Sequence, residues 1–162
     1  MKLYERNLSK QAMAKYYLDS CIWLNLFNKE QNKVQNVPVW KIAQEFLKQY
    51  KGDIISSLFV AKEIEDKTSD KKEEIKFLKQ ISILKDAEDK EYILGREIES
   101  KEGYHLSFFD CMHLAIAKTR GYILVTRDRE LLERGKIPRG NRTRETIVLN
   151  ISYSAFSHLY TF

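Results

Sequence analysis

The sequence contains only two cysteines, no long apolar run and no internal repeat or low-complexity segment. Cys21 and Cys111 both have apolar neighbours, which indicates buried thiols in a reducing compartment such as the cytoplasm, and argues against a disulfide framework. No apolar run approaches the roughly 20 residues that a membrane-spanning helix needs. Residues 1–12 are polar and charged and lack the apolar core of a signal peptide. These shortages exclude a disulfide-rich scaffold and a membrane span.

The remaining composition is typical of one globular domain. A chain of 162 residues with 43% hydrophobic residues is long enough to bury a substantial core. We expect this single domain to cover residues 15–162, preceded by an N-terminal extension at residues 1–14 that shows no clear period. The net charge of +5 and the isoelectric point near 9.1 are compatible with an anionic partner.

Short apolar segments alternate with segments of helical spacing. The predicted strands are residues 15–18, 54–55, 122–125 and 146–149. The predicted helices are residues 22–27, 39–50, 58–66, 70–81, 86–101 and 108–120, with one more helical turn at 130–134. Residues 83–84 either form another short extended piece or end a helix. Strands separated by helices predict an α/β fold, a three-layer α/β/α sandwich with a mostly parallel central sheet.

The segment from Ser107 to Asp128 combines a helix, a glycine stop, a buried strand and an acid. Ser107 can cap the helix, and Gly121 stands where a left-handed C-terminal residue is favoured. Asp110 falls in the first turn of this helix, and Asp128 follows the strand directly. Because sites in open parallel sheets form outside the carboxyl ends of the strands, both carboxylates fall where a site is expected.

Two further acids are predicted to reach the same edge of the sheet. Asp19 stands at the junction between the first strand and its helix, and right-handed crossovers bring such junctions to one side. Glu63 follows about two turns into the helix after the second strand, closer to its apolar side than Glu65. Each acid alone also has a structural explanation: Asp19 fits a helix N-cap, worth about 1 kcal/mol, and Asp110 fits a capping box with Ser107. Their joint placement favours a shared site.

Carboxylates gathered at one edge repel one another unless a cation lies among them. The candidate ligands are all oxygen atoms, which favours Mg²⁺ or Mn²⁺, and the three histidines and two cysteines show no zinc-ligand spacing. A hard cation held by carboxylates and open to a phosphate is typical of metal-assisted phosphodiester hydrolysis. His113 could be read as a catalytic base, but one turn after Asp110 we expect a packing or hydrogen-bonding residue outside the site.

Basic residues are concentrated between Arg120 and Arg144, where eight Lys or Arg face three acids. Charge runs of this kind usually form a solvated surface. Arg127 and Arg129 flank Asp128, however, so the same segment is also a candidate phosphate-binding rim beside the acids.

Four segments together resemble a PIN domain, most closely a small stand-alone toxin of the VapC type. They are Tyr17-Leu18-Asp19-Ser20, Ile55-Ser56-Ser57 through Glu63-Ile64, Phe109 through Ala117, and Leu124 through Asp128, within a resemblance that spans about Lys15 to Leu149.

The resemblance implies a metal-dependent endoribonuclease that cleaves single-stranded RNA. Its catalytic and Mg²⁺- or Mn²⁺-binding residues would be Asp19, Glu63, Asp110 and Asp128. Ser20 and Thr126 would orient the carboxylates or a water molecule. Arg127 and Arg129 are the RNA-binding candidates, and an antitoxin protein and a second copy of the chain are candidate protein partners.

Other classes of protein also gather acids on a parallel sheet. A phosphotransfer receiver needs adjacent early acids and a phosphoacceptor on a middle strand, but this chain has one acid after its first strand. A haloacid-dehalogenase-type phosphatase needs Asp-x-Asp there, and the sequence has Asp19-Ser20-Cys21. A PIN-like fold kept as a silent RNA- or protein-binding module would be marked by loss of the acids, and all four are present. A nuclease of this fold that is not a toxin would carry the same acids.

Overall fold

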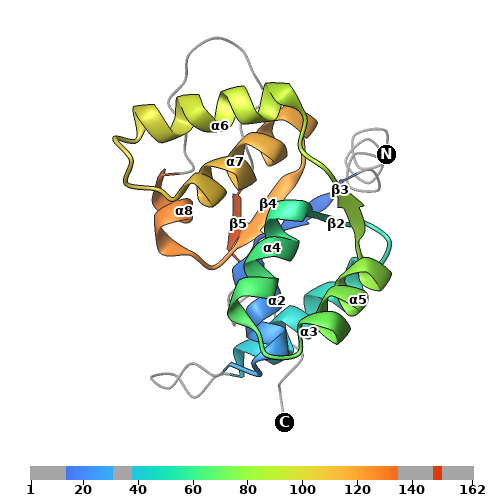
Figure 1. Cartoon of the computed structure of the whole chain (residues 1–162). Coiled ribbons are helices and arrows are strands. Elements are labelled where there is room, and N and C mark those ends of the chain that lie inside the picture. Colours follow the sequence, from blue (N-terminus) through green and yellow to red (C-terminus); the bar gives the residue numbers. More distant parts are fainter. Residues whose placement is uncertain (1–13, 31–37, 135–147, 151–162) are drawn as a thin grey trace, which may run out of the picture.

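The computed structural model describes residues 14–30, 38–134 and 148–150. Within them, five short strands form one sheet in the order β3-β2-β1-β4-β5 (Figure 1). The strands are β1 (Tyr16–Leu18), β2 (Ile54–Ser57), β3 (Ile83–Lys85), β4 (Ile123–Thr126) and β5 (Val148–Asn150). Every pairing among the described strands is parallel, as the sequence predicts.

The central strand of the sheet is β1. Tyr17 stands opposite Ile55 of β2 on one side and opposite Leu124 of β4 on the other. Both Tyr17 and Leu18 are fully buried, because neighbouring strands and helices enclose β1. This explains why the strands read as continuous apolar runs without alternation.

Helices cover both faces of the sheet. They are α2 (Ser20–Phe27), α3 (Val39–Gln49), α4 (Leu58–Lys67), α5 (Lys71–Ile81), α6 (Asp89–Lys101), α7 (Phe108–Arg120) and α8 (Arg129–Arg134). The chain steps from β1 through β2 to β3 in one direction, and from β3 to β4 and β5 in the other. Right-handed crossovers therefore place α2 to α5 on one face and α6 and α7 on the other, as Figure 1 shows. This is the predicted three-layer α/β/α sandwich.

The central helix of the second layer is α7. The Ser107 hydroxyl accepts a hydrogen bond from the backbone N–H of Asp110 at 3.1 Å, and Gly121 ends the helix with a left-handed φ of 67°. Both ends agree with the sequence prediction. Residues 111–117 are all buried, whereas the sequence predicts a single apolar face. The reason is that α6 packs along the side of α7 that faces away from the sheet.

Several element boundaries differ from the prediction. Residues 83–85 form the edge strand β3, β2 continues through Ser57, and α6 begins at Asp89. The described part of the last strand is Val148–Asn150. Residues 1–13 lie outside the described part of the chain, so the N-terminal extension stays a prediction.

The two cysteines are both free. Cys111 is buried as expected, but Cys21 is only partly buried because it lies on the first turn of α2 beside the carboxyl edge of β4. No helix in the described ranges is long and apolar enough to cross a membrane.

Candidate active site

The acidic residues gather where the strand order reverses. Asp19 directly follows β1, and Asp128 lies two residues after the end of β4. These two strands are neighbours, and the chain leaves them in opposite directions across the sheet. The crevice outside the carboxyl ends of such strands is the usual ligand site of an open parallel sheet.

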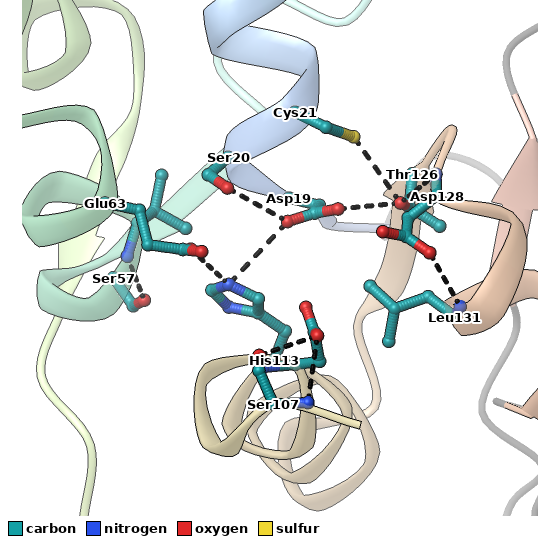
Figure 2. Close-up of polar contacts among 12 residues, drawn as sticks. Asp19, Ser20, Cys21, Ser57, Glu63, Ser107, His113, Thr126, Asp128 and Leu131 are labelled. Carbon is teal, nitrogen blue, oxygen red and sulfur yellow. Dashed lines mark hydrogen bonds and ion pairs between the residues drawn. The ribbon is translucent and has the colours of Figure 1, made fainter. Parts of the chain in front are cut away.

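The carboxylate of Asp19 lies between Ser20 and His113 on one side and Thr126 on the other (Figure 2). Asp19 occupies the N-cap position of α2, yet its side chain makes no cap hydrogen bond within the described structure. Instead, Oδ2 accepts a hydrogen bond from the Thr126 hydroxyl at 2.7 Å, and Oδ1 lies 3.4 Å from the Ser20 hydroxyl. The Asp19 side chain is buried. Helix capping therefore does not explain the side chain of Asp19.

Glu63 approaches the same point from α4. Its exposed fraction is 8%, and its Oε2 atom lies 2.7 Å from Nε2 of His113, which in turn lies 3.6 Å from Oδ1 of Asp19. One donor atom from each of these three residues lies within 4.8 Å of the others, a spacing that could hold a metal ion. Glu65 has a more exposed side chain and belongs to no such group in the described part of the chain.

Asp110 and Asp128 lie outside this tight group, and both also cap a helix. Oδ2 of Asp110 accepts hydrogen bonds from the hydroxyl (2.6 Å) and the backbone N–H (3.3 Å) of Ser107, completing the capping box. Oδ1 of Asp128 accepts from the backbone N–H of Leu131 at 3.1 Å. Helix capping, the structural role that the sequence suggests for Asp110, is therefore confirmed, and Asp128 also caps a helix. A capping carboxylate can still take part in the site.

Electrostatics connects Asp110 to the other acids. Burial raises the pKa of Asp110, and the negative charges of Asp19 and Asp128 raise it further, against the hydrogen bonds from Ser107 and the charge of His113. The charges of three acids are thus coupled at one edge of the sheet, where a cation would relieve the cost of ionising Asp110.

Thr126 is the polar residue that joins the two strands of the crevice. It is fully buried, its hydroxyl donates to Asp19, and the same oxygen accepts from the backbone N–H of Asp128 at 2.9 Å. Cys21 Sγ lies 3.5 Å from this oxygen (Figure 2). Ser20 contributes the longer contact with Asp19. Both hydroxyl residues that the sequence singles out thus lie beside the Asp19 carboxylate.

The basic segment is not one continuous rim. Nη1 of Arg127 lies 3.4 Å from the side-chain oxygen of Asn25, while Arg129 is strongly exposed. Arg120 is wrongly included in the rim: it pairs with the fully buried Glu91 through Nε at 2.6 Å. It stands at the far end of α7, roughly 15 Å from Asp110 along the helix axis. Residues 135–144 lie outside the described ranges.

Sequence reasoning missed the contacts of His113. Its position three residues after Asp110 on a helix predicts that both face the same way, but nothing in the sequence shows that α4 approaches this face. Burial by itself would lower the pKa of His113, but the hydrogen bond with Glu63 and the charges of Asp19 and Asp110 raise it above its usual value. The structure therefore puts a hydrogen-bonding histidine in contact with the acids.

The fold is an α/β fold with a parallel sheet, and its carboxylates lie at the switch point, the edge between β1 and β4 where the strand order reverses. This acidic site could bind a cation. The family model of the PIN domain matches residues 16–137. The chain belongs to the PIN domain family, whose members are nucleases.

Solved structures of similar fold include toxin–antitoxin proteins. DNA-bound VapBC from Salmonella typhimurium matches with a TM-score of 0.59 and 17% identity, over 86% of this chain and 100% of that chain. VapBC2 from Rickettsia felis, bound to a DNA fragment from its promoter, matches with a TM-score of 0.60 and 16% identity, over 83% and 97%. A toxin–antitoxin complex from Klebsiella pneumoniae matches with a TM-score of 0.57 and 16% identity, over 72% and 90%. At such low sequence identity, these structural matches establish similarity of fold alone. No curated protein sequence matches the chain.

Proposed function

We propose that the protein is a Mg²⁺- or Mn²⁺-dependent endoribonuclease that cleaves single-stranded RNA and acts as the toxin of a toxin–antitoxin pair. The observation that carries the proposal is the convergence of two buried carboxylates, Asp19 and Glu63, at the switch point of a nuclease-family sheet. Carboxylates are rarely buried unless they are paired or bind a metal.

The donor atoms present fit a hard divalent cation. Asp19, Glu63, Asp110 and Asp128 would hold it through carboxylate oxygens, the ligands that Mg²⁺ and Mn²⁺ prefer. The nearby protein cations replace such an ion only in part: Lys67 reaches Glu63 at 3.8 Å from an exposed position, and one imidazole, His113, faces both Glu63 at 2.7 Å and Asp19 at 3.6 Å. When bound, the cation would lower the pKa of a coordinated water and stabilise charge on the attacked phosphate.

The chain's own residues would position the reacting groups. Thr126 fixes one carboxylate oxygen of Asp19 and so restricts the rotation of that side chain. Arg127 and Arg129 lie on either side of Asp128 and would bind the RNA backbone through phosphate oxygens. Arg129 is free to reach a ligand, because its ion pair with Glu133 is long at 3.9 Å and its side chain is 89% exposed.

Two protein partners belong to the proposal. The similar structures from Salmonella typhimurium and Rickettsia felis are VapBC proteins, which supports an antitoxin as the partner of this chain. A homodimer is the second proposed assembly. Leu58 of α4 and the α6 residues Tyr92 and Ile93 expose 46%, 43% and 62% of their surface, which would suit contact with a protein.

The proposed activity is tested with purified protein, labelled single-stranded RNA and Mn²⁺, with a duplex of the same sequence in parallel. We expect cleavage of the single strand that stops on addition of EDTA. Glu63→Gln should abolish it, and Glu65→Gln, the same change two residues away on α4, is the matched control. Cleavage that persists in EDTA would refute metal dependence, and Mn²⁺ binding without cleavage of any RNA would favour a silent binding module.

A further inference from the structure

One buried chain of hydrogen bonds runs from the core of the sheet to Glu63. The backbone N–H of Val60 lies 3.3 Å from the Ser57 hydroxyl, which lies 2.7 Å from the Tyr17 hydroxyl. The Tyr17 hydroxyl lies 2.8 Å from Nδ1 of His113, and Nε2 of His113 lies 2.7 Å from Oε2 of Glu63. Ser57, Tyr17 and His113 are all fully buried, so this chain is enclosed by protein.

We propose that Tyr17 and His113 are positioning residues that fix the carboxylate of Glu63, and that His113 donates a hydrogen bond to it through Nε2 without binding the metal itself. The inference rests on the proposed function for the role of Glu63 as a metal ligand. It adds two residues, Tyr17 and His113, that the sequence does not assign to the site.

The direction of the hydrogen bonds follows from counting hydrogens. The Val60 N–H can only donate, and the Glu63 carboxylate can only accept. In the neutral ring, the form present at alkaline pH, a hydrogen on Nε2 lets Ser57 donate to Tyr17, Tyr17 donate to Nδ1 and Nε2–H donate to Glu63. Every donor between α4 and the carboxylate then has an acceptor, as buried polar groups require. In the protonated ring both nitrogens carry hydrogens, and Nε2–H donates to Glu63 as well.

The opposite tautomer fits poorly. A hydrogen on Nδ1 would leave the lone pair of Nε2 facing a carboxylate oxygen at 2.7 Å, with no hydrogen between two acceptors. A ring nitrogen that carries a hydrogen has no lone pair for a metal ion. The same nitrogen lies 3.6 Å from Asp19 Oδ1, so it also faces the second buried acid.

The Tyr17 hydroxyl therefore acts on Glu63 through the His113 ring, without contacting the carboxylate itself. By donating to Nδ1 of the neutral ring it selects the tautomer that holds Glu63, in the way that hydrogen-bond partners behind a metal ligand set the ligand's orientation. Loss of such a partner typically weakens metal affinity by about 10- to 100-fold. Tyr17 is fully buried in β1 and does not reach RNA, so its loss should change metal affinity and leave KM for RNA unchanged.

The test compares Tyr17→Phe with Tyr16→Phe, which removes the same hydroxyl from the neighbouring residue of β1. Tyr16 packs against Phe46 and Tyr50, away from the acids. Calorimetric titration with Mn²⁺ should show affinity about 10-fold weaker for Tyr17→Phe and unchanged for Tyr16→Phe. Thermal unfolding of both apo variants should show that each remains folded. His113→Gln retains an N–H donor and should bind Mn²⁺ more tightly than His113→Leu, which has none.

A second readout needs no metal. Long-range ¹H–¹⁵N spectra at alkaline pH report which ring nitrogen of His113 carries the hydrogen, and the signals are assigned by their loss in His113→Gln. We expect Nε2–H in the wild type. Protonation at Nδ1, or equal Mn²⁺ affinity of the wild type and Tyr17→Phe, would overturn the inference alone. A wild-type protein that binds no Mn²⁺ would overturn the proposed function and the positioning role together.

Discussion

The substitution Thr126→Val should reveal how strongly one hydroxyl holds the crevice together. Valine has nearly the shape of threonine, so the change keeps the side-chain volume on β4 and puts a methyl group in place of the hydroxyl. Two hydrogen bonds to oxygen or nitrogen are lost, one to the Asp19 carboxylate at 2.7 Å and one from the backbone N–H of Asp128 at 2.9 Å, together with the weaker contact to Cys21 Sγ at 3.5 Å. Thr126 has no exposed surface, so water cannot readily replace it.

The expected cost follows from the two bonds. A hydrogen bond to a charged group contributes about 1.5–3 kcal/mol and a neutral one about 0.5–1.5 kcal/mol. The free energy of unfolding should therefore fall by about 2–4.5 kcal/mol. Cleavage should fall as well, because the Asp19 carboxylate loses the donor that restricts its rotation.

Urea unfolding measures this cost against two controls. Thr126→Ser keeps the hydroxyl and loses one methyl group, for which about 1 kcal/mol is expected. Thr119→Val removes a hydroxyl that bonds to the carbonyl of Ala115 in α7, away from the acids, and should cost less than about 1 kcal/mol. If Thr126→Val is no more destabilising than Thr119→Val and cleaves RNA at the wild-type rate, the assigned role of Thr126 is wrong.

Three further predictions concern the acids, the arginines and the core. Asp19→Asn, Asp110→Asn and Asp128→Asn should each abolish RNA cleavage without unfolding the protein; unfolding of all three would make them purely structural. Burial raises the pKa of Asp110 in the folded protein above its pKa in the unfolded chain. Ionisation of Asp110 therefore lowers the free energy of unfolding as the pH rises above the unfolded pKa, so Asp110→Asn should have an equal or higher melting temperature at pH 7. Changing Arg127 and Arg129 together to Gln should weaken RNA binding and reduce the slope of log K against log salt concentration by about 1.4, at about 0.7 for each phosphate contact. Lys48→Gln, which changes an exposed lysine, serves as control. An unchanged slope would show that the arginines do not touch RNA. Gly95→Ala should lower the free energy of unfolding, measured by chemical denaturation, by about 1 kcal/mol net. The added Cβ would lie 2.5 Å from the buried Met112 sulfur, and this overpacking outweighs the gain in helix propensity. A stabilised variant would contradict this close approach of α6 and α7.

The sequence by itself determined the elements and the acids at their ends. Ser107 and Gly121 bound α7 because an N-cap hydroxyl and a left-handed glycine act within one turn of the chain. The short apolar segments predicted β1, β2 and β4, and strand-to-helix order predicted a parallel sheet. Asp19 and Asp128 could be placed at its carboxyl edge on the same grounds. Caps, apolar segments and the order of strands and helices depend on residues that are close together in the sequence, so the sequence alone is enough to recognise them.

Only the tertiary structure decided which side chains meet. Glu63 and His113 are separated by 50 positions, and the contact depends on how α4 packs against α7. Tyr17 reads as one more buried strand residue until its hydroxyl is seen beside the His113 ring. Arg120 reads as part of a basic rim, but Glu91 holds it at the opposite end of α7. Periodicity gives the face of a helix, whereas a hydrogen bond between elements also requires their spacing and the side-chain rotamers, which only the packed fold sets.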